Sequence, residues 1–397
     1  MKRFPFLIII CLTTISCDRD LNNYKAKFVV PLDVDNKKEL SECIDSISIV
    51  PLEITDNWKY IVYPSIYASD KLFVVLDAHY YRLLVFNKSD FSLLFAKDIK
   101  GRGRGEIMTP GNTFILSQDT ICIFDQSSGR ISMYGTDGRF IDFLNKENEI
   151  CADYVYPVRD YIVAVSQDGG NMYNRDYVSY YKRDGSLLRR QLKIPDMVYE
   201  CGVYSGDGPS CFTYNDTLRF IMPFTYHLFS STLNKLESTY LFDVDRAIPK
   251  DYFNKSDDMM ISMGRIIKDE YVWNFHNIVE TDNHIAFSFL EGQNKFKTLI
   301  DKRTNAVSTY AMTTSPEHEL TSVVNIWRYV LATTNVIYAD NDYLYAYIKP
   351  IQNEVLEASK VLDIRLETYS QSTRDYIEKY NEFIDNDTRI IVKIKLK

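Results

Sequence analysis

Two stretches of similar pattern decide the fold of this chain. Residues 71–86 have the sequence KLFVVLDAHYYRLLVF, and residues 119–134 have the sequence DTICIFDQSSGRISMY. In both, an apolar run ends in aspartate, a short turn follows, and an arginine opens a second apolar run. Runs of this length that are rich in β-branched and aromatic residues and bounded by turn residues are typical of β-strands. The repetition predicts a recurring pair of antiparallel strands.

Further strands flank each pair. Ser65–Tyr67 and Ser92–Phe95 lie on either side of the first pair, and Thr113–Leu116 and Arg139–Phe143 lie on either side of the second. Four antiparallel strands that return after about 45 residues are typical of the blades of a β-propeller. Looser units of the same kind follow along the rest of the chain, and their count predicts six blades.

The two ends of the chain complete this prediction. The final strand, Arg389–Leu396, is free to pair with the early strand Ser46–Leu52. This pairing would join the first and last blades, whose open edges would otherwise be prone to aggregation. We therefore expect an all-β fold over residues 28–397: a six-bladed β-propeller of four-stranded antiparallel blades, closed by its N- and C-terminal strands.

Three details of the later units are also expected. In the fifth unit we take Asn277–Thr281 as the first strand. The long charged connection before it, Asp243–Asp269, is expected to include a short helix. A short helical insertion near the C-terminus is predicted over Thr373–Ile384, where apolar and aromatic residues recur at helical spacing.

The N-terminus has the three parts of a secretory signal: a basic dipeptide, an apolar run over Phe4–Leu12 and a short polar end. The apolar run is too short to cross a bilayer, which takes about 20 residues. Thr14–Cys17 resembles the lipobox of bacterial lipoproteins, in which the cysteine is acylated and becomes the new N-terminus. We therefore predict a signal peptide over residues 1–16, lipid on Cys17 and a lipidated tether over residues 17–27.

This resemblance also implies a location. Several acyl chains on one cysteine hold a protein firmly to a membrane, whereas a single chain holds it only marginally. We expect the protein in the cell envelope, anchored to the outer membrane and facing the periplasm or the cell surface. Asp18 and Asp20 follow Cys17 and resemble surface-export signals of some Gram-negative bacteria. The alternative is an ordinary signal peptide with an incidental cysteine.

Charge and cysteine content narrow the partners and the chemistry. The chain has a net charge of −8, which argues against general nucleic-acid binding, because that needs a basic surface. Cys201 and Cys211 flank a turn-rich segment and could close a small loop by a disulfide in an oxidising compartment. Cys122 lies inside an apolar strand and is interpreted as a small buried hydrophobic residue.

One segment carries a resemblance to a family. Gly101–Ile107, GRGRGEI, looks like the Gly-x-Gly-Pro-Gly-Glu-Phe link between blades of NHL-type propellers, with Arg104 in place of the usual proline and Ile107 in place of the usual aromatic residue. Together with the lipobox and the terminal strands, it makes the chain resemble the six-bladed β-propeller lipoproteins of Gram-negative anaerobes. The resemblance implies the fold over the whole mature chain, but no common activity.

The usual catalytic signatures are missing from the sequence. It has no Gly-x-Ser-x-Gly elbow, no His-Glu-x-x-His, no Cys-x-x-Cys and no Gly-Lys-Ser/Thr phosphate loop. The glycines between Gly101 and Gly105 lack the strand-then-helix context of a nucleotide loop, and we expect them to form a turn between blades. No cofactor is expected, and whether the protein is an enzyme stays open, with a binding role favoured.

A possible ligand site follows from the topology of a propeller, in which the turns of one face gather around the central axis. Aromatic rings beside arginine and asparagine suit a sugar or a peptide, because flat apolar faces stack and polar groups fix orientation. Arg82 and Arg130 also have another interpretation, because residues that recur in every blade tend to serve the blade. The candidate ligand residues are Tyr80, Tyr81, Arg82, Arg102, Arg104, Arg130, Tyr173, Asn274, His276, Trp327 and Arg328.

Three histidines give an alternative function. His79 and His227 precede third strands, and His276 lies where the first strand of the fifth unit is expected to begin. If they met at the axis they could hold a metal ion, as the metal ligands of NHL-like enzymes do. The simpler alternative is that each forms a hydrogen bond within its own blade, because no close spacing unites them.

Three hypotheses for the function result. The first is a lipid-anchored, non-enzymatic module that binds a glycan, a peptide or a partner protein of the cell envelope. The second is a metal-dependent hydrolase or lyase acting at the central axis. The third is a scaffold that supports the assembly of a larger envelope complex.

Overall fold

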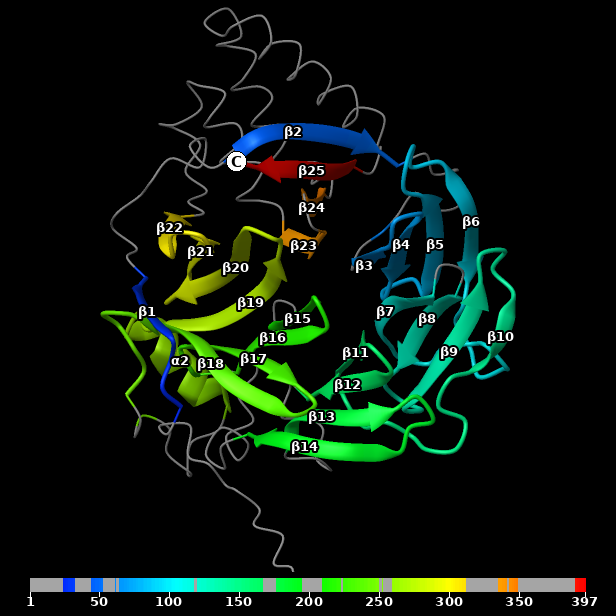
Figure 1. Ribbon diagram of the computed structural model, residues 1–397, viewed down its shortest axis with the longest axis horizontal. Helices are drawn as coiled ribbons and strands as arrows, with labels where there is room; N and C mark the ends of the chain where they lie inside the picture. Colours follow the sequence, from blue (N-terminus) through cyan, green and yellow to red (C-terminus); the bar gives the residue numbers. More distant parts are fainter. Residues whose placement is uncertain are drawn as a thin grey trace, which may run out of the picture.

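The computed structural model describes residues 24–32, 44–52, 61, 64–117, 120–166, 176–194, 209–222, 224–249, 252, 259–311, 335–340, 343–348 and 390–397. These residues form six sheets around one axis, which is the six-bladed β-propeller that the sequence predicts (Figure 1). In each blade four strands lie side by side, from the innermost strand at the axis to the outermost strand at the rim. The innermost strands of neighbouring blades contact one another.

Each blade has four antiparallel strands. From the axis outward, blade one contains β3 (Pro64–Ala68), β4 (Leu72–Asp77), β5 (Arg82–Asn87) and β6 (Leu93–Asp98). Blade two contains β7 (Pro110–Ser117), β8 (Thr120–Asp125), β9 (Arg130–Gly135) and β10 (Phe140–Phe143). Blade three contains β11 (Tyr154–Val158), β12 (Tyr161–Val165), β13 (Asp176–Lys182) and β14 (Leu187–Lys193).

The second half of the ring follows the same order. Blade four contains β15 (Cys211–Tyr214), β16 (Thr217–Ile221), β17 (His227–Thr232) and β18 (Lys235–Asp243). Blade five contains β19 (Val272–Glu280), β20 (His284–Glu291), β21 (Asn294–Asp301) and β22 (Ala306–Ala311). Blade six contains β23 (Asn335–Ala339), β24 (Tyr343–Ile348), β25 (Ile390–Leu396) and β2 (Ile44–Pro51).

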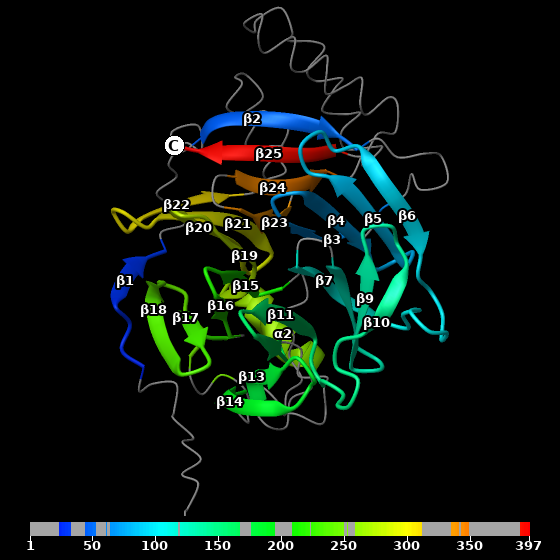
Figure 2. The same cartoon turned by 45° about the vertical axis from the view of Figure 1, so that its right-hand side comes forward.

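Blade six closes the ring as the sequence predicts. The C-terminal strand β25 pairs with β24 on one side and with the N-terminal strand β2 on the other (Figure 2). In this pairing Val50 lies opposite Ile391. Because strands from both ends of the chain share one sheet, the ring cannot open without breaking that sheet's hydrogen bonds.

The N-terminal segment contributes one strand that the sequence did not indicate. β1 (Phe28–Pro31) runs parallel to β18 and adds a fifth strand to the outer edge of blade four (Figure 1). Val30 and Leu32 are buried there, in the hydrophobic cluster between blades four and five. The N-terminal segment therefore packs onto the rim of blade four before the chain enters blade six.

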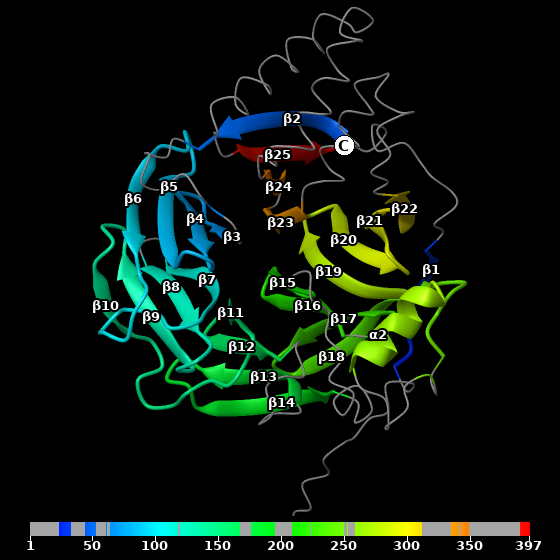
Figure 3. The same cartoon turned by 180° about the vertical axis from the view of Figure 1, so that it is seen from behind.

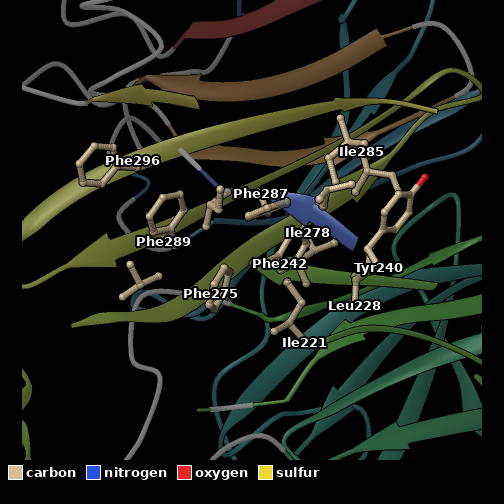
Figure 4. Packing of buried hydrophobic residues seen from close by; sticks show 14 residues of the cluster. Ile221, Leu228, Tyr240, Phe242, Phe275, Ile278, Ile285, Phe287, Phe289 and Phe296 are labelled. Atoms are coloured by element: carbon tan, nitrogen blue, oxygen red, sulfur yellow. The ribbon is translucent and has the colours of Figure 1, made fainter. Parts of the chain in front are cut away.

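The uninterrupted apolar runs reflect how the blades pack. Every residue of β4 is buried, because each blade is covered by a neighbour on both faces and both sets of alternating side chains face a core. Figure 4 shows the cluster between blades four and five, where Phe242, Phe275 and Phe287 pack together. The rings of Phe242 and Phe275 stack with centroids 5.7 Å apart.

The aspartate that ends each second strand of blades one and two fixes the turn that follows. The backbone N–H of His79 donates to Asp77 Oδ1 at 3.0 Å, and that of Ser127 donates to Asp125 Oδ1 at 3.1 Å. Carboxylates that accept from the backbone two residues later are typical of Asx turns. The repeated Asp therefore serves the blade.

A helix covers part of one face of the disk. Helix α2 (Met259–Lys268) lies in the connection between β18 and β19, where the sequence predicts a short helix (Figure 3). Ile266 packs against Trp273 and Leu290 of blade five. The predicted insertion at Thr373–Ile384 lies outside the described residues. Among the helices that the structure describes, none is long and apolar enough to span a membrane.

Candidate functional site

The innermost strand of blade five, β19, departs from the regular strand pattern. Val272, Phe275 and Ile278 all pack in the cluster between blades four and five, although they are three residues apart and not two. The spacing is explained by Asn274 and Asn277, which both have φ of 52° and lie at the two places where the register with β20 shifts. Each asparagine is the extra residue of a β-bulge, because a bulge inserts one residue into the alternation.

These bulges correct one expectation from the sequence. The first strand of this blade is Val272–Glu280 and not Asn277–Thr281, so His276 lies in the middle of the strand and not at its beginning. Because of the two bulges, apolar and polar residues of β19 do not alternate with the period of two that predicts a regular strand. Asn277 was therefore taken as an ordinary strand residue, although the spacing of three between Val272, Phe275 and Ile278 was a readable signal.

Both asparagines also leave polar atoms without hydrogen bonds. Asn274 is 6% exposed and Asn277 is 5% exposed. Within the described part of the chain, neither Asn274 Oδ1 nor Asn277 Nδ2 has a hydrogen-bond partner. Burying an unsatisfied amide group costs about 1–3 kcal/mol, and strained backbone with unsatisfied polar groups is typical of functional sites. We take this segment as the candidate site.

The residues around the asparagines are held firmly. His276 is buried, and its Nδ1 lies 2.7 Å from the carbonyl oxygen of Asn274. Because a carbonyl oxygen can only accept, the ring donates from Nδ1 in this contact. The backbone N–H of Asn277 donates to the carbonyl oxygen of Pro209 at 2.8 Å, which ties the bulge to the segment entering blade four. Trp273 Nε1 donates to the carbonyl oxygen of Gly292 at 2.9 Å.

The candidate residues of blade one lie together in one turn. Tyr80 is exposed, and the Arg82 guanidinium lies 4.7 Å from the centroid of its ring. Tyr81 has φ of 57°, and Lys100 lies 4.9 Å from the centroid of its ring. Arg82 lies directly opposite Asp77 in the sheet. This group belongs to a different blade from Asn274 and His276.

Arg130 of blade two and Arg104 of the glycine-rich link both cover aromatic rings of blade two. Arg130 lies 5.1 Å from the ring centroid of Phe143, and Arg104 lies 5.5 Å from that of Phe140. Because Arg82 and Arg130 occupy equivalent positions and both lie over a nearby ring, their geometry is consistent with a role in the blade. Three further candidates, Tyr173, Trp327 and Arg328, lie outside the described residues.

The glycine-rich link forms a turn between blades, as the sequence predicts. The backbone N–H of Gly103 donates to Glu106 Oε2 at 2.6 Å. A Cβ on Gly101 would lie 1.9 Å from that oxygen, so the Glu106 carboxylate fills the loop. The N–H group that a phosphate would need is taken by this carboxylate. Arg102, in the same loop, is exposed.

The three histidines do not meet. His79 is exposed in the turn after β4, with its ring edge-on to Tyr80. His227 opens β17, and its Nδ1 lies 2.8 Å from Ser238 Oγ. Burial lowers the pKa of His227. No group of three His, Cys, Asp or Glu residues suited to a metal ion occurs within the described ranges, so the grouping of these histidines was wrong.

Two of the cysteines considered in the sequence, Cys122 and Cys211, are buried in strands. Cys122 is buried in β8, as predicted, and burial raises the pKa of its thiol to about 12. Cys211 is buried at the start of β15, and its Sγ lies 3.5 Å from the hydroxyl of Tyr156. Its proposed partner Cys201 lies outside the described residues, so the disulfide stays a prediction.

Blades four and five are also joined by a buried ionic cluster that the sequence did not indicate. Glu280, at the end of β19, is fully buried. It accepts from Arg219 Nε at 2.6 Å and lies 2.8 Å from Lys302 Nζ. Arg219 is on β16, 61 residues earlier in the chain. The Lys302 ammonium also lies 4.7 Å from the ring centroid of Tyr214.

Comparison with known proteins identifies the family of the chain and solved structures of similar fold. The model of a family described as a domain of unknown function (DUF4934) matches residues 27–360. Among solved structures, a Bacteroides fragilis NCTC 9343 protein described as exported is similar at 15% identity with a TM-score of 0.68, covering 93% of this chain and 99% of that chain.

A second solved structure has a weaker likeness. It is a member of the DUF4221 family from Bacteroides vulgatus ATCC 8482, similar at 10% identity with a TM-score of 0.50, covering 89% of this chain and 97% of that chain. At such identities the likeness shows the fold alone. No curated protein matches the chain.

Proposed function

This chain belongs to the family described as a domain of unknown function, DUF4934, and we propose that it is a lipid-anchored module of the cell envelope that binds a glycan, a peptide or a partner protein at the axis of its propeller. The family and the fold leave the activity open, so the proposal depends on the residues of the candidate site. It has two parts, the ligand site and the anchor.

The ligand site depends on a single observation, which is the pair of buried amide groups in β19. Asn274 Oδ1 is an acceptor and Asn277 Nδ2 is a donor, and among the described residues neither has a partner. A sugar hydroxyl or a peptide group can both donate and accept, so such a ligand would satisfy the two atoms together. The two bulges place these amides on the innermost strand of blade five.

The anchor is supported by the sequence around Cys17 and by the position of the first described residues. Tyr24 packs edge-on against Phe229 of blade four with ring centroids 5.4 Å apart, and β1 follows at the rim of that blade. The seven steps from Cys17 to Tyr24 span at most about 25 Å when fully extended. Lipid on Cys17 would therefore hold the rim of blade four close to the membrane.

The metal-dependent alternative loses its support, because His79, His227 and His276 lie in blades one, four and five without a common centre. The scaffold alternative keeps one observation in its favour. Leu94, Ile141 and Leu187 are exposed apolar residues on the outermost strands of blades one to three. Exposed apolar residues on neighbouring edges suit contact with another protein. Cross-linking of the anchored protein in cells would identify a rim partner.

The ligand site is tested with Asn277→Gly. Glycine keeps the positive φ of 52° and removes the unsatisfied amide. We expect the full mature chain, purified in detergent, to bind defined members of a glycan array or a peptide array. Asn277→Gly should weaken that binding at least about tenfold, the loss of one good hydrogen bond in a buried site, without lowering the melting temperature.

Asn215→Gly is the matched control, because Asn215 also has a positive φ of 45° but is exposed in the turn after β15. It should leave ligand binding unchanged. Unaltered binding by Asn277→Gly, or a wild-type protein that retains nothing from either array, would exclude the proposed site.

A further inference from the structure

Two neighbouring blades form the part of the rim at which the chain enters the fold. The outermost strand of blade four is β1, within residues 24–31, and the outermost strand of blade three is β14. Figure 1 and Figure 2 both show β14 along the lower edge of the ring and β1 on its left edge. We call residues 24–31 and Leu187–Lys193 together the anchor rim.

The two segments reach the same part of blade four. Tyr24 packs against Phe229 and belongs, with Leu233, to the cluster between blades three and four. The guanidinium of Arg189 on β14 donates to the carbonyl oxygen of Leu233 at 3.0 Å. The chain that comes from Cys17 therefore enters the fold close to β14.

The anchor rim exposes apolar side chains to solvent. Of the nine large hydrophobic residues that are exposed in the described part of the chain, four belong to it: Phe28, Val29, Leu187 and Leu188. The exposed fraction reaches 64% at Val29. The other five are scattered over blade one, blade two, the link between these blades and helix α2. Exposed apolar residues gathered in one region are typical of a surface that contacts a protein or a membrane.

The anchor rim is also basic, although the whole chain has a net charge of −8. It contains no Asp or Glu and five exposed cationic residues: Lys25, Lys27, Arg189, Arg190 and Lys193. Two of them have carboxylate partners on adjacent strands, since Lys27 pairs with Glu237 and Arg190 pairs with Asp176. Five cations less these two carboxylates leave an excess of three positive charges.

The outermost strands of the other blades have no such excess. β6 contains one lysine and one aspartate, β10 and β2 contain one aspartate each, and β22 contains no charged residue. Cations on an edge strand hinder its pairing with another sheet, but exposed leucines beside them would favour such a contact. Protection of the edge therefore does not explain both features of the anchor rim.

We propose that the anchor rim docks onto the bilayer that holds the lipid of Cys17. Its apolar side chains enter the boundary between headgroups and acyl chains, and its cations contact the phosphate groups of anionic lipids. The inference rests on the anchor of the proposed function and adds the surface by which the fold itself contacts the membrane. Because the tether to Tyr24 spans at most about 25 Å, the rim stays within reach of the bilayer.

Such a contact decides how the protein stands on the membrane. β1 and β14 lie on the circumference of the ring and not on either of its faces (Figure 1). Docking through them sets the disk edge-on, so that neither face is pressed against the bilayer.

The test places a tryptophan at the rim of the full, lipidated protein. Leu188→Trp is reconstituted into vesicles of brominated phosphatidylcholine that contain about one third phosphatidylglycerol. Bromine on the acyl chains quenches a tryptophan that lies at the headgroup boundary. We expect the emission that Leu188→Trp adds to the wild-type emission to fall by about half or more, as for a side chain docked about 5–10 Å into the interface.

Ile141→Trp is the matched control. Ile141 is exposed on β10, the outermost strand of blade two, outside the anchor rim. The emission that this variant adds should stay unquenched in the same vesicles. Melting temperatures establish that both variants fold.

The charges are tested in the Leu188→Trp background. Lys25→Gln and Arg189→Gln together should shift the docking equilibrium at least about tenfold toward the undocked state, because each cation near an anionic surface strengthens the contact. Vesicles without phosphatidylglycerol should have the same effect. Arg139→Gln, which removes an exposed arginine of blade two, should leave the quenching unchanged.

Three results would overturn the inference. If Leu188→Trp is quenched no more than Ile141→Trp, the rim does not contact lipid, and a partner protein becomes its occupant. Quenching that is independent of Lys25, Arg189 and phosphatidylglycerol excludes recognition of anionic lipid. In both cases the anchor stands, provided that mass spectrometry finds acyl chains on Cys17. A Cys17 without acyl chains in protein isolated from cell membranes overturns the anchor and this inference together.

Discussion

Replacing Glu280 by glutamine is expected to loosen the joint between blades four and five. The Glu280 carboxylate is 0% exposed, and it holds Arg219 of blade four and Lys302 of blade five at 2.6 and 2.8 Å. Glutamine has nearly the same shape but no charge, and its amide N–H₂ group faces donors that it cannot accept from. Two cations that are 19% and 24% exposed then lose their counter-charge.

The loss of stability expected for Glu280→Gln follows from the burial of this cluster. Removing one partner of a buried ion pair costs about 3–5 kcal/mol, because it leaves uncompensated buried charge. Arg219 and Lys302 retain some contact with water, so the lower limit of about 3 kcal/mol applies to this cluster. For a folded chain of this length the entropy of unfolding is about 0.8 kcal/mol per degree, so the melting temperature should fall by about 4 °C.

Glu237→Gln is the matched control. Glu237 also pairs with two lysines, Lys27 at 3.0 Å and Lys235 at 2.5 Å, but on the exposed rim of blade four. Exposed pairs contribute about 0–1 kcal/mol, so its melting temperature should fall by about 1 °C or less. Differential scanning calorimetry measures both. Equal shifts for the two variants would refute the argument that burial makes the Glu280 cluster strong.

Two further predictions concern single residues. Burial raises the pKa of the Cys122 thiol to about 12, so iodoacetamide at pH 8 should leave Cys122 unmodified in the native protein and modify it in urea. Mass spectrometry locates the modified cysteines. Equal modification of Cys122 in the native and the urea-unfolded protein would contradict a buried thiol. Gly105→Ala should destabilise the protein by about 2–4 kcal/mol, because Gly105 has φ of 79° and a Cβ there would lie 2.6 Å from the Phe140 ring. Gly264→Ala should instead stabilise the protein by about 1 kcal/mol, because Gly264 lies inside helix α2 with open space around it. Urea unfolding measures the free energy of unfolding of both variants. A change of the same sign in that free energy for the two variants would contradict these contacts.

Much of the fold could be predicted because its information is local. The strands of a blade are neighbours in sequence, so the apolar runs, the aspartate turns and the glycine link between β6 and β7 are readable one after another. Closure by β2 and β25 followed from the need to cover open edges. The strand β1 was missed because four residues beside a tether carry no pattern that distinguishes them from a linker.

The candidate site was predicted only in part. Asn274 and His276 were candidates because they were expected near the axis, but the sequence placed His276 at the beginning of its strand and grouped it with two distant histidines. Asn277 was missed, because a bulge changes the period of the strand from two to three at that point. Trp327 and Arg328 stay predictions.

The sequence by itself determined the repeating blade, its number of strands and the closure of the ring, because antiparallel neighbours joined by short turns are specified by adjacent residues. The tertiary structure alone decided which polar groups meet. Glu280 pairs with Arg219 across 61 residues, and two bulges set the register of β19 against β20 and with it the face on which His276 lies. A slip of one residue would turn every side chain of that strand to the opposite face, so the composition of the site depends on how β19 pairs with β20.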